Sequence, residues 1–302
     1  MRVFLAGASG AIGRRLVPLL VSTGHQVVGT TTTPSKLDEL QRLGAEPVQL
    51  DLLDAVATKR AVADAKPDVI VHQATALAKL GKNSRNLSKA FAVTNQLRTV
   101  GTHNLLDAAW DVGVSRFIAQ GFCGLAFARA EQIDGDISSG MRAGRDAMRS
   151  LEETVADIGG VILSYGGFYG PGTSLGRDGE QTAMVRRRLL PMIGTGDTIF
   201  QFLHIDDAAT ATLAALTRGE GHYDIVDDEP AALSEWVPAM AAILGAKPPR
   251  HMPMWLAKLV AGDGAALFTI EAPASSNVRA KADLSWKPAY PSWREGFAHE
   301  LG

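Results

Sequence analysis

Short apolar runs alternate with helix-like spacing of apolar residues through the first half of the chain. The spacing predicts a helix from about Ala11 and further helices at 36–43, 56–65, 87–110 and 141–156. Apolar runs typical of buried strands lie at residues 3–6, 26–30, 48–50, 68–71, 116–119 and 161–164. Strands that alternate with helices of this length pair in parallel through right-handed crossovers. We therefore expect an α/β fold built on a doubly wound parallel sheet.

This alternation stops after Tyr165. A turn-forming Tyr-Gly-Pro-Gly stretch at 169–172 opens a loop-rich section, and helical patterns follow at 206–216, 233–244, 254–260 and 292–301. We therefore predict that residues 1–165 form the doubly wound domain. Residues 166–302 would form mainly a smaller substrate-binding lobe, and a part of them, about 198–220, would return to the first domain.

A glycine-rich turn joins the first predicted strand to the first helix. It reads Gly7-Ala8-Ser9-Gly10-Ala11-Ile12-Gly13. Glycines at such a turn let the backbone approach a pyrophosphate, while the N–H groups and dipole of the helix N-terminus attract its charge. We therefore predict a dinucleotide site that includes Gly7, Ser9, Gly10, Ala11, Ile12 and Gly13, within an NAD(P)-binding domain of Rossmann type. An ordinary tight turn without a ligand is the alternative.

Composition indicates a cytoplasmic protein without a charged macromolecular partner. The 302 residues are 46% hydrophobic, and the formal net charge of −2 gives no reason to expect nucleic acid or a membrane as partner. Cys123 is the single cysteine, so no disulfide can form within the chain, which suits a reducing compartment. We expect no membrane span, no leader segment and no metal site, because the patterns for each are missing. A homodimer is left open.

Seven short motifs, spread over nearly the whole chain, follow the order of one known family. They are AGASGAIG at 6–13, DLLD at 51–54, HQATA at 72–76, GTHNLLDAA at 101–109, YGPG at 169–172, FLHIDDAATA at 202–211 and PSWREGF at 291–297. With them the chain resembles the extended short-chain dehydrogenases/reductases, the NAD(P)-dependent epimerase/dehydratase group. The resemblance implies a Rossmann domain that binds NAD(P) and a C-terminal part that binds most of a small-molecule substrate.

The end of the second predicted strand bears on the choice between NADP(H) and NAD(H). An acidic residue there would accept hydrogen bonds from the ribose 2′-hydroxyl and repel a 2′-phosphate. The chain instead has Thr31 and Thr32, with Lys36 just beyond, and Arg14 and Arg15 after the glycine turn. These residues favour NADP(H), with NAD(H) as the alternative. The resemblance implies further cofactor contacts: Asp51 and Leu52 at the adenine, the small Ala74 and Thr75, and Arg98, Gln120, Tyr165, Gly166 and Phe168.

The catalytic residues of the family are missing from this chain. Relatives use a tyrosine whose pKa is lowered by a lysine four residues on, helped by a serine after the fifth strand. No Tyr-x-x-x-Lys occurs here, and the corresponding positions are Gly144 and Met148. Gly121 stands where the serine is expected. The standard proton donor therefore cannot be transferred to this chain.

Two kinds of explanation remain for these replacements. We favour an atypical enzyme that transfers hydride between NADP(H) and a small organic substrate with another proton source, for which Tyr169, Cys123 and Asp146 are the side-chain candidates and water or the substrate the others. The alternatives are a non-catalytic, regulatory NADP(H)-binding protein and a sugar-nucleotide epimerase or dehydratase. A sugar-nucleotide epimerase would also rely on the missing tyrosine and lysine.

Overall fold

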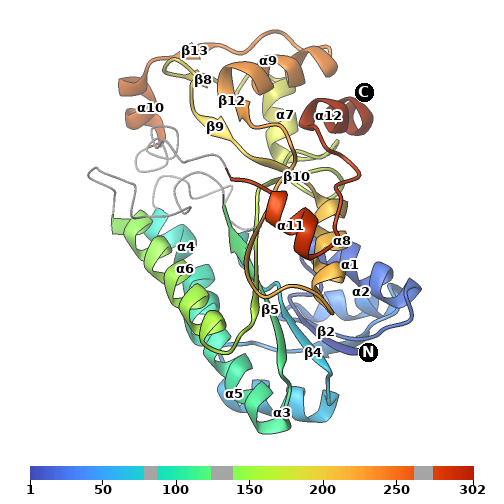
Figure 1. The fold of residues 1–302 in the computed structure, drawn as a ribbon. Coiled ribbons are helices and arrows are strands. Elements are labelled where there is room, and N and C mark those ends of the chain that lie inside the picture. Colours follow the sequence, from blue (N-terminus) through green and yellow to red (C-terminus); the bar gives the residue numbers. More distant parts are fainter. Residues whose placement is uncertain (78–86, 124–138, 262–274) are drawn as a thin grey trace.

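The computed structural model describes residues 1–77, 87–123, 139–261 and 275–302 (Figure 1). Within these residues, seven parallel strands form one sheet in the order β11-β6-β5-β4-β1-β2-β3. The strands are β1 (Arg2–Ala6), β2 (Gln26–Thr31), β3 (Glu46–Gln49), β4 (Val69–His72), β5 (Arg116–Phe122), β6 (Val161–Tyr165) and β11 (Gly221–Ile225). The order runs outward from β1 on one side and from β4 on the other. The predicted doubly wound parallel sheet is therefore confirmed.

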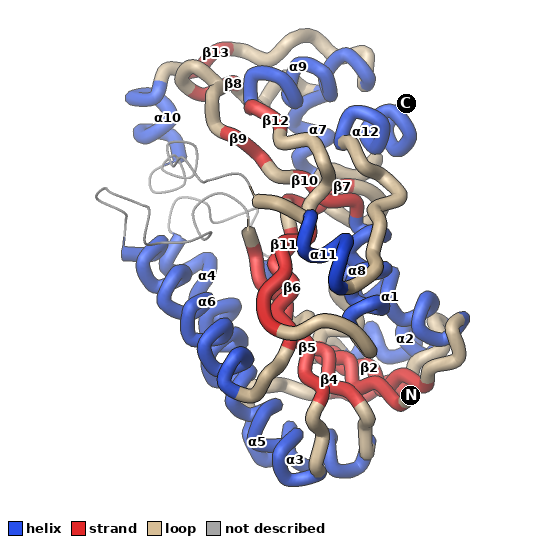
Figure 2. The backbone as a smooth tube through the Cα atoms, in the orientation of Figure 1, coloured by secondary structure: helices blue, strands red, loops and turns tan. Residues whose placement is uncertain are grey.

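Helices cover both faces of this sheet (Figure 2). One face carries α1 (Ala11–Ser22), α2 (Leu37–Arg42), α8 (Ile205–Ala215) and α11 (Val278–Asp283). The other carries α3 (Ala55–Ala65), α4 (Leu87–Gln96), α5 (Thr102–Val112) and α6 (Ser139–Asp157). Successive strand residues point to opposite faces, so Val69 and Val71 join one core cluster and Ile70 the other. Burial on both faces explains why these strands read as continuous apolar runs.

Two elements differ in detail from their sequence patterns. Strand β3 starts at Glu46, two residues before the predicted start, and includes Pro47. Strand β3 is at the edge of the sheet. An edge strand tolerates proline, because the missing N–H can lie on the side that has no neighbouring strand. The helix predicted over 87–110 is interrupted by a π-helical turn at Leu97–Gly101, between α4 and α5. Such turns insert one residue into a helix and re-aim the side chains around it.

The remaining elements form what we call the C-terminal lobe. Its elements are β7 (Gly167–Tyr169), α7 (Glu180–Arg186), β8 (Met192–Ile193), β9 (Ile199–Phe200), β10 (Phe202–His204), β12 (Ala231–Ala232), α9 (Leu233–Ile243), β13 (His251–Met252), α10 (Met254–Ala261) and α12 (Trp293–Leu301). An aromatic core holds them together, in which Phe202 packs edge-on against Trp236 and Phe297. Edge-to-face pairs of this kind add about 0.5–1.5 kcal/mol each beyond their buried area.

The chain returns from the lobe to the sheet within residues 205–225. Helix α8 packs along α1, and β11 then pairs with β6 as the last strand of the sheet. Strands β9 and β10, by contrast, pair with β12 and β7 inside the lobe. The returning part thus comprises α8 and β11. Among the described helices, none is long and apolar enough to cross a membrane.

Candidate active site

The three glycines of the first turn have different structural roles. Gly7 adopts φ +84°, and a Cβ there would lie 2.7 Å from the backbone of Ala74. A Cβ at Gly13 would overlap the carbonyl of Ala8, so this glycine lets α1 pack closely on the turn. A Cβ at Gly10 would meet only the Gly7 carbonyl, at 3.2 Å. The second glycine therefore leaves an open side, as required where backbone must approach a ligand.

Among the described residues, no side chain competes with an anion for the N-terminus of α1. Gly10 is its N-cap, no side chain caps it, and its first turn, which begins with Ala11 and Ile12, contains no acidic residue. The first N–H groups of a helix need an acceptor, and the dipole makes an anion the favoured one. The turn and the helix start thus fit the pyrophosphate of a dinucleotide, the role predicted for residues 7–13.

The end of β2 presents hydroxyl groups and no carboxylate. Ser9 Oγ donates to Thr31 Oγ1 at 2.8 Å, and the backbone N–H of Thr33 donates to the same oxygen at 3.2 Å. Thr31 is buried, whereas Thr32 is exposed. Lys36 follows in the short 3-10 turn η1 (Pro34–Lys36), where its ammonium pairs with Glu39 at 2.8 Å. The strand end therefore keeps the donors expected for a 2′-phosphate, with one acid beside them.

The predicted adenine and ribose residues lie at the neighbouring strand ends. After β3, Asp51 accepts the N–H of Leu53 at 3.0 Å and stays exposed, while Leu52 is buried against the core. After β4, the backbone of Ala74 lies against Gly7, and Ala74 and Thr75 are only half-buried. Because the carboxyl ends of parallel strands share one edge, these residues face the same edge of the sheet as the glycine turn.

Arg98 lies inside the π-helical turn and is only 4% exposed. Burial lowers the pKa of its guanidinium to about 10, and the carboxylate of Glu152 on α6 opposes that shift. The same turn exposes the Leu97 carbonyl to His72, whose Nε2–H donates to it at 3.2 Å. Burial lowers the pKa of His72 to about 4, so this imidazole is neutral at physiological pH. Arg98, a predicted cofactor contact, is thus a buried cation whose charge also lowers the pKa of His72, the last residue of β4.

The other predicted cofactor residues sit at the ends of β5 and β6. Tyr165 is fully buried, and its hydroxyl lies between Gln73 Nε2 at 3.0 Å and Thr212 Oγ1 at 2.6 Å. Burial raises the pKa of Tyr165 to about 12. Its ring packs 5.5 Å from that of Phe168, whereas Gln120 is half-buried on β5. Gly166 lies beside the Gln201 carbonyl, where a Cβ would come within 2.7 Å.

Tyr169 does not present its hydroxyl to the glycine turn. The residue is fully buried in the core of the C-terminal lobe, where its ring packs edge-on against Phe202 and Phe297. A Cβ at Gly296 would overlap the Tyr169 ring and hydroxyl, so Gly296 leaves the room that this side chain fills. Burial, with nearby carboxylates such as Asp227, raises the pKa of Tyr169 far above its usual range. This geometry disfavours Tyr169 as a proton donor.

The other two candidate donors are no better placed. Cys123 is 3% exposed, and burial, followed by the charge of Asp224, raises the pKa of its thiol to about 12. Asp146 lies on α6, with its side chain 64% exposed beside Arg145. Gly144 and Met148, the positions that correspond to the family's tyrosine and lysine, are buried on the same helix. The exposed and buried positions thus fall on different sides of α6.

A hydroxyl group occupies the space above Gly121, but it comes from the neighbouring strand. Gly121 of β5 pairs with Ser164 of β6, and a Cβ at Gly121 would overlap Ser164 Oγ. Ser164 is 1% exposed, and its hydroxyl has no hydrogen-bond partner among the described residues. The sequence interpretation missed this residue, although a serine inside the apolar run 161–164 was a usable signal. A buried serine hydroxyl thus lies beside Gly121, on the neighbouring strand β6.

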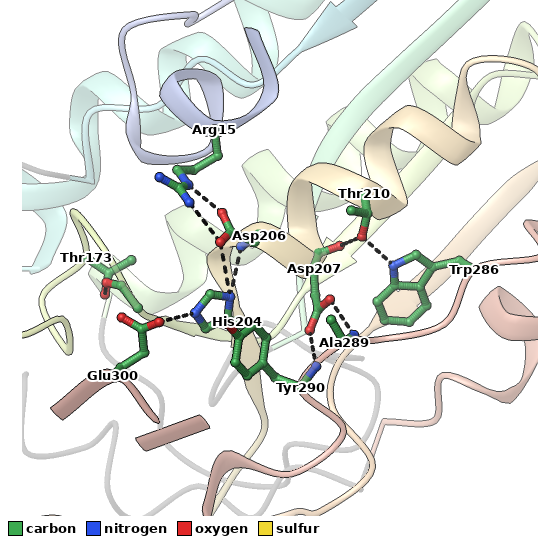
Figure 3. A network of polar contacts seen from close by, with 11 residues as sticks. Arg15, Thr173, His204, Asp206, Asp207, Thr210, Trp286, Ala289, Tyr290 and Glu300 are labelled. Atoms are coloured by element: carbon green, nitrogen blue, oxygen red, sulfur yellow. Dashed lines mark hydrogen bonds and ion pairs between the residues drawn. The ribbon is translucent and has the colours of Figure 1, made fainter. Parts of the chain in front are cut away.

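A polar network links α1 to the C-terminal lobe beside the site (Figure 3). Arg15, in the second turn of α1, donates hydrogen bonds to the carboxylate of Asp206 at the start of α8. The bond from Nη2 to Oδ2 is 2.8 Å long. His204 Nδ1 accepts the N–H of Asp206 at 3.2 Å and thereby caps α8. The other ring nitrogen lies 3.3 Å from Glu300 of α12, and the ring stacks on Tyr290 at 3.9 Å. His204 thus has the structural role of a helix cap.

Two family descriptions match the chain. The NAD(P)H-binding family matches residues 7–172, and the NAD dependent epimerase/dehydratase family matches residues 141–226. A protein of Streptomyces sp named 3-diazoavenalumate denitrifying reductase is 40% identical over 99% of this chain and 100% of its own length. The chain belongs to the extended short-chain dehydrogenases/reductases.

Further members of this short-chain dehydrogenase/reductase family are less similar. The 2-alkyl-3-oxoalkanoate reductase of Stenotrophomonas maltophilia is 26% identical over 82% of this chain and 76% of its own length. The structure of UDP-glucose 4-epimerase from Thermotoga maritima with UDP-glucose has a TM-score of 0.78 at 20% identity, covering 99% of this chain and 97% of that chain. The structure of the Thermus thermophilus UDP-glucose 4-epimerase with NAD has a TM-score of 0.73 at 21% identity, covering 99% of this chain and 97% of that chain.

These comparisons confirm the predicted family, fold and enzyme class. The solved structures share the fold of this chain. The full-length reductase relative and the NAD(P)H-binding match show that the chain is an NAD(P)-dependent oxidoreductase of the extended short-chain dehydrogenase/reductase type. The comparisons thus show a cofactor of the NAD(P) class.

Proposed function

We propose that this protein is an NADPH-dependent reductase that removes a diazo group from a small organic acid as dinitrogen. The full-length relative named as a denitrifying reductase of a diazo compound supports this substrate class. The observation that carries the proposal is the site itself, in which Gly144 and Met148 are buried and the candidate donors Tyr169 and Cys123 have raised pKa values. The reaction should therefore be one that needs no proton from these side chains.

Replacement of a diazonium group by hydride meets this condition. When bound, the reduced nicotinamide supplies the hydride. One C–H bond forms and one C–N bond breaks, its electron pair leaves with dinitrogen, and NADPH is oxidised to NADP⁺. Reduction of a ketone, by contrast, needs a proton for the alkoxide oxygen, which an acid with a pKa near the working pH donates best. Tyr169 and Cys123 are far from that range.

The chain's own residues would bind the cofactor and leave the position of the family's lysine uncharged. The glycine turn and the start of α1 would hold the pyrophosphate, and Ser9, Thr31 and Lys36 would surround the adenosine ribose and its 2′-phosphate. Met148 replaces the cation that the family places beside the substrate. An ammonium group there would repel a cationic diazonium, whereas a thioether does not.

The test uses 4-carboxybenzenediazonium as the probe and NADPH deuterated at nicotinamide C4. We expect oxidation of NADPH, release of dinitrogen, and benzoate that carries deuterium at the carbon that held nitrogen. Unlabelled NADPH in D₂O should give benzoate without deuterium at that carbon. Because diazonium salts react slowly with many reductants, parallel reactions without protein set the background. Dinitrogen release at the background rate, or a product labelled by D₂O, would contradict the proposal.

A carbonyl substrate is the competing possibility, since one relative is named a 2-alkyl-3-oxoalkanoate reductase. NADPH oxidation by a 3-oxo acid, with no dinitrogen from the diazonium probe, would support that class of substrate. Interconversion of UDP-glucose and UDP-galactose would support the epimerase alternative. Tight NADPH binding without turnover of any of these substrates would support a regulatory role.

A further inference from the structure

Glu39 of α2 contacts two cations, Lys36 after β2 and Arg14 of α1. Its Oε2 is 2.8 Å from Lys36 Nζ, and its Oε1 is 3.8 Å from Arg14 Nη1. The three side chains are between 26% and 39% exposed, so bulk water screens them only in part. The hydrogen bond from Lys36 holds the pKa of Glu39 below its usual value. Glu39 is therefore a charged carboxylate at neutral pH.

Two members of this ion-pair trio directly follow segments that are predicted to bind the cofactor. Arg14 comes from α1, directly after the glycine turn, and Lys36 comes from η1, directly after β2. The hydroxyls of Ser9 and Thr31 are hydrogen-bonded to each other at that strand end. In a Rossmann fold this end of the second strand faces the ribose 2′-position, where a hydroxyl or a phosphate distinguishes NAD from NADP.

The carboxylate of Glu39 takes the partners that a 2′-phosphate would need. Phosphate binds lysine and arginine through charge-assisted hydrogen bonds, as a carboxylate does. A bound 2′-phosphate therefore competes with the Glu39 carboxylate for Lys36 and Arg14, and it then faces a like charge. A ribose 2′-hydroxyl makes neither demand, and it can donate a hydrogen bond to the carboxylate.

We propose that Glu39 is an internal counter-ion that occupies the 2′-phosphate subsite and limits the affinity of the protein for NADPH. Lys36 and Arg14 exchange the carboxylate for the phosphate when NADPH binds. Glu39 thus sets the ratio of NADPH to NADH affinity. This inference rests on the NADPH preference proposed above, but it concerns how strong that preference is.

The test compares NADPH and NADH binding to wild-type protein and to Glu39→Gln by titration calorimetry. Glutamine keeps the length and a hydrogen-bond acceptor for Lys36 but removes the charge. We expect the Kd for NADPH to fall about tenfold, which corresponds to the loss of one partly screened like-charge contact, and the Kd for NADH to stay equal or rise slightly. The gain should shrink as salt is raised, because screening weakens the contact.

A neighbouring acid provides the matched control. Asp38 is exposed in the same first turn of α2, outside the ion-pair trio. Asp38→Asn should cost the helix the same favourable dipole interaction and leave the Kd for NADPH within about twofold of wild type. The converse variant, Lys36→Met, should weaken NADPH binding and leave NADH binding unchanged.

Fragments of the cofactor localise the effect. Glu39→Gln should bind 2′,5′-ADP more tightly than wild type does, with 5′-AMP unaffected. If wild type prefers NADPH but Glu39→Gln changes neither cofactor, or changes both equally, the role of Glu39 is overturned while the preference stands. If wild type binds the two cofactors equally and Glu39→Gln gains affinity for NADPH alone, the role of Glu39 is supported and the proposed preference is wrong.

Discussion

At the scale of single residues, Gly10 and Gly7 separate ligand binding from folding. Gly10 has φ −74° and ψ 177°, which any residue adopts, and its open side faces the predicted pyrophosphate position. A Cβ there would lie 3.2 Å from the Gly7 carbonyl, so Gly10→Val should lower stability by about 1–2 kcal/mol, less than a side chain at Gly7 would. It should weaken NADPH binding about a hundredfold or more, because branched carbons stand where backbone must approach phosphate.

Calorimetry with NADPH and a thermal melt check this prediction. Gly7→Val is the contrasting variant, since a side chain there meets both a left-handed φ and the backbone of Ala74. It should lower stability by more than about 2 kcal/mol. Unchanged NADPH affinity of Gly10→Val would place the pyrophosphate elsewhere.

The hydroxyl of Tyr169 is dispensable for the proposed chemistry. It is buried in an aromatic core without a hydrogen-bond partner among the described residues. Tyr169→Phe should keep turnover within about twofold and leave stability unchanged or raise it by about 1 kcal/mol, because an unpaired buried hydroxyl costs free energy. Steady-state kinetics and a thermal melt provide the measurements. A hundredfold fall in kcat with intact NADPH binding would instead identify Tyr169 as the proton donor.

Residues differ in how far the sequence alone could place them. The glycine turn could be predicted because its residues are contiguous in the sequence and the backbone requires glycine at defined positions in it. Lys36 and Glu39 are three residues apart, so their pairing was also within reach. Arg14 with Glu39, and Ser164 with Gly121, are contacts between elements, and nothing in one sequence fixes which residues face each other across a sheet or between helices.

At the scale of elements, the helix after β4 shows what apolar spacing misses. Its predicted extent, 87–110, nearly matches the observed α4 and α5, but the π-helical turn at Leu97–Gly101 was not expected. The spacing of apolar residues cannot reveal this turn. One inserted residue shifts the apolar positions by less than they normally vary along a helix. The turn frees the Leu97 carbonyl for His72 and directs Arg98 inward. The local irregularity therefore decides what lies beneath the end of β4.

At the scale of the whole molecule, burial of Asp227 should make stability depend on pH. Asp227 is 4% exposed, and burial raises its pKa from 3.8 to about 8. The native state therefore keeps this proton where the unfolded chain loses it. Its contribution to stability is fully present below pH 3.8 and is lost as pH rises through about 8.

Asp227→Asn removes this titration and keeps the shape of the side chain. The melting temperature of the variant minus that of wild type should increase between pH 4 and pH 8 and then level off. Thermal melts in buffers across that range measure the difference, in which the titrations of other groups largely cancel. Parallel curves for the two proteins would show that Asp227 is ionised in the native state.

The overall architecture was predictable because alternating strands and helices admit few arrangements. The last strand of the sheet, β11, could not be predicted in this way. Residues 221–225 read Gly-His-Tyr-Asp-Ile, with His222 and Asp224 alternating with Tyr223 and Ile225. The latter two are buried in the core, whereas His222 is exposed. An edge strand with one polar side does not resemble the fully apolar strands beside it, and its neighbour β6 lies far back in the sequence.

The position of β11 has a consequence for the order in which the protein is completed during synthesis. When Tyr165 has been made, six of the seven strands exist, but β6 is still an open edge of the sheet, and the part of the face that α8 will cover is bare. The ribosome must add all of residues 166–220 before β11 can close that edge. Unpaired strand edges invite contacts with other chains. The nascent cofactor-binding half is therefore most exposed to misassembly while the first part of the lobe is being translated.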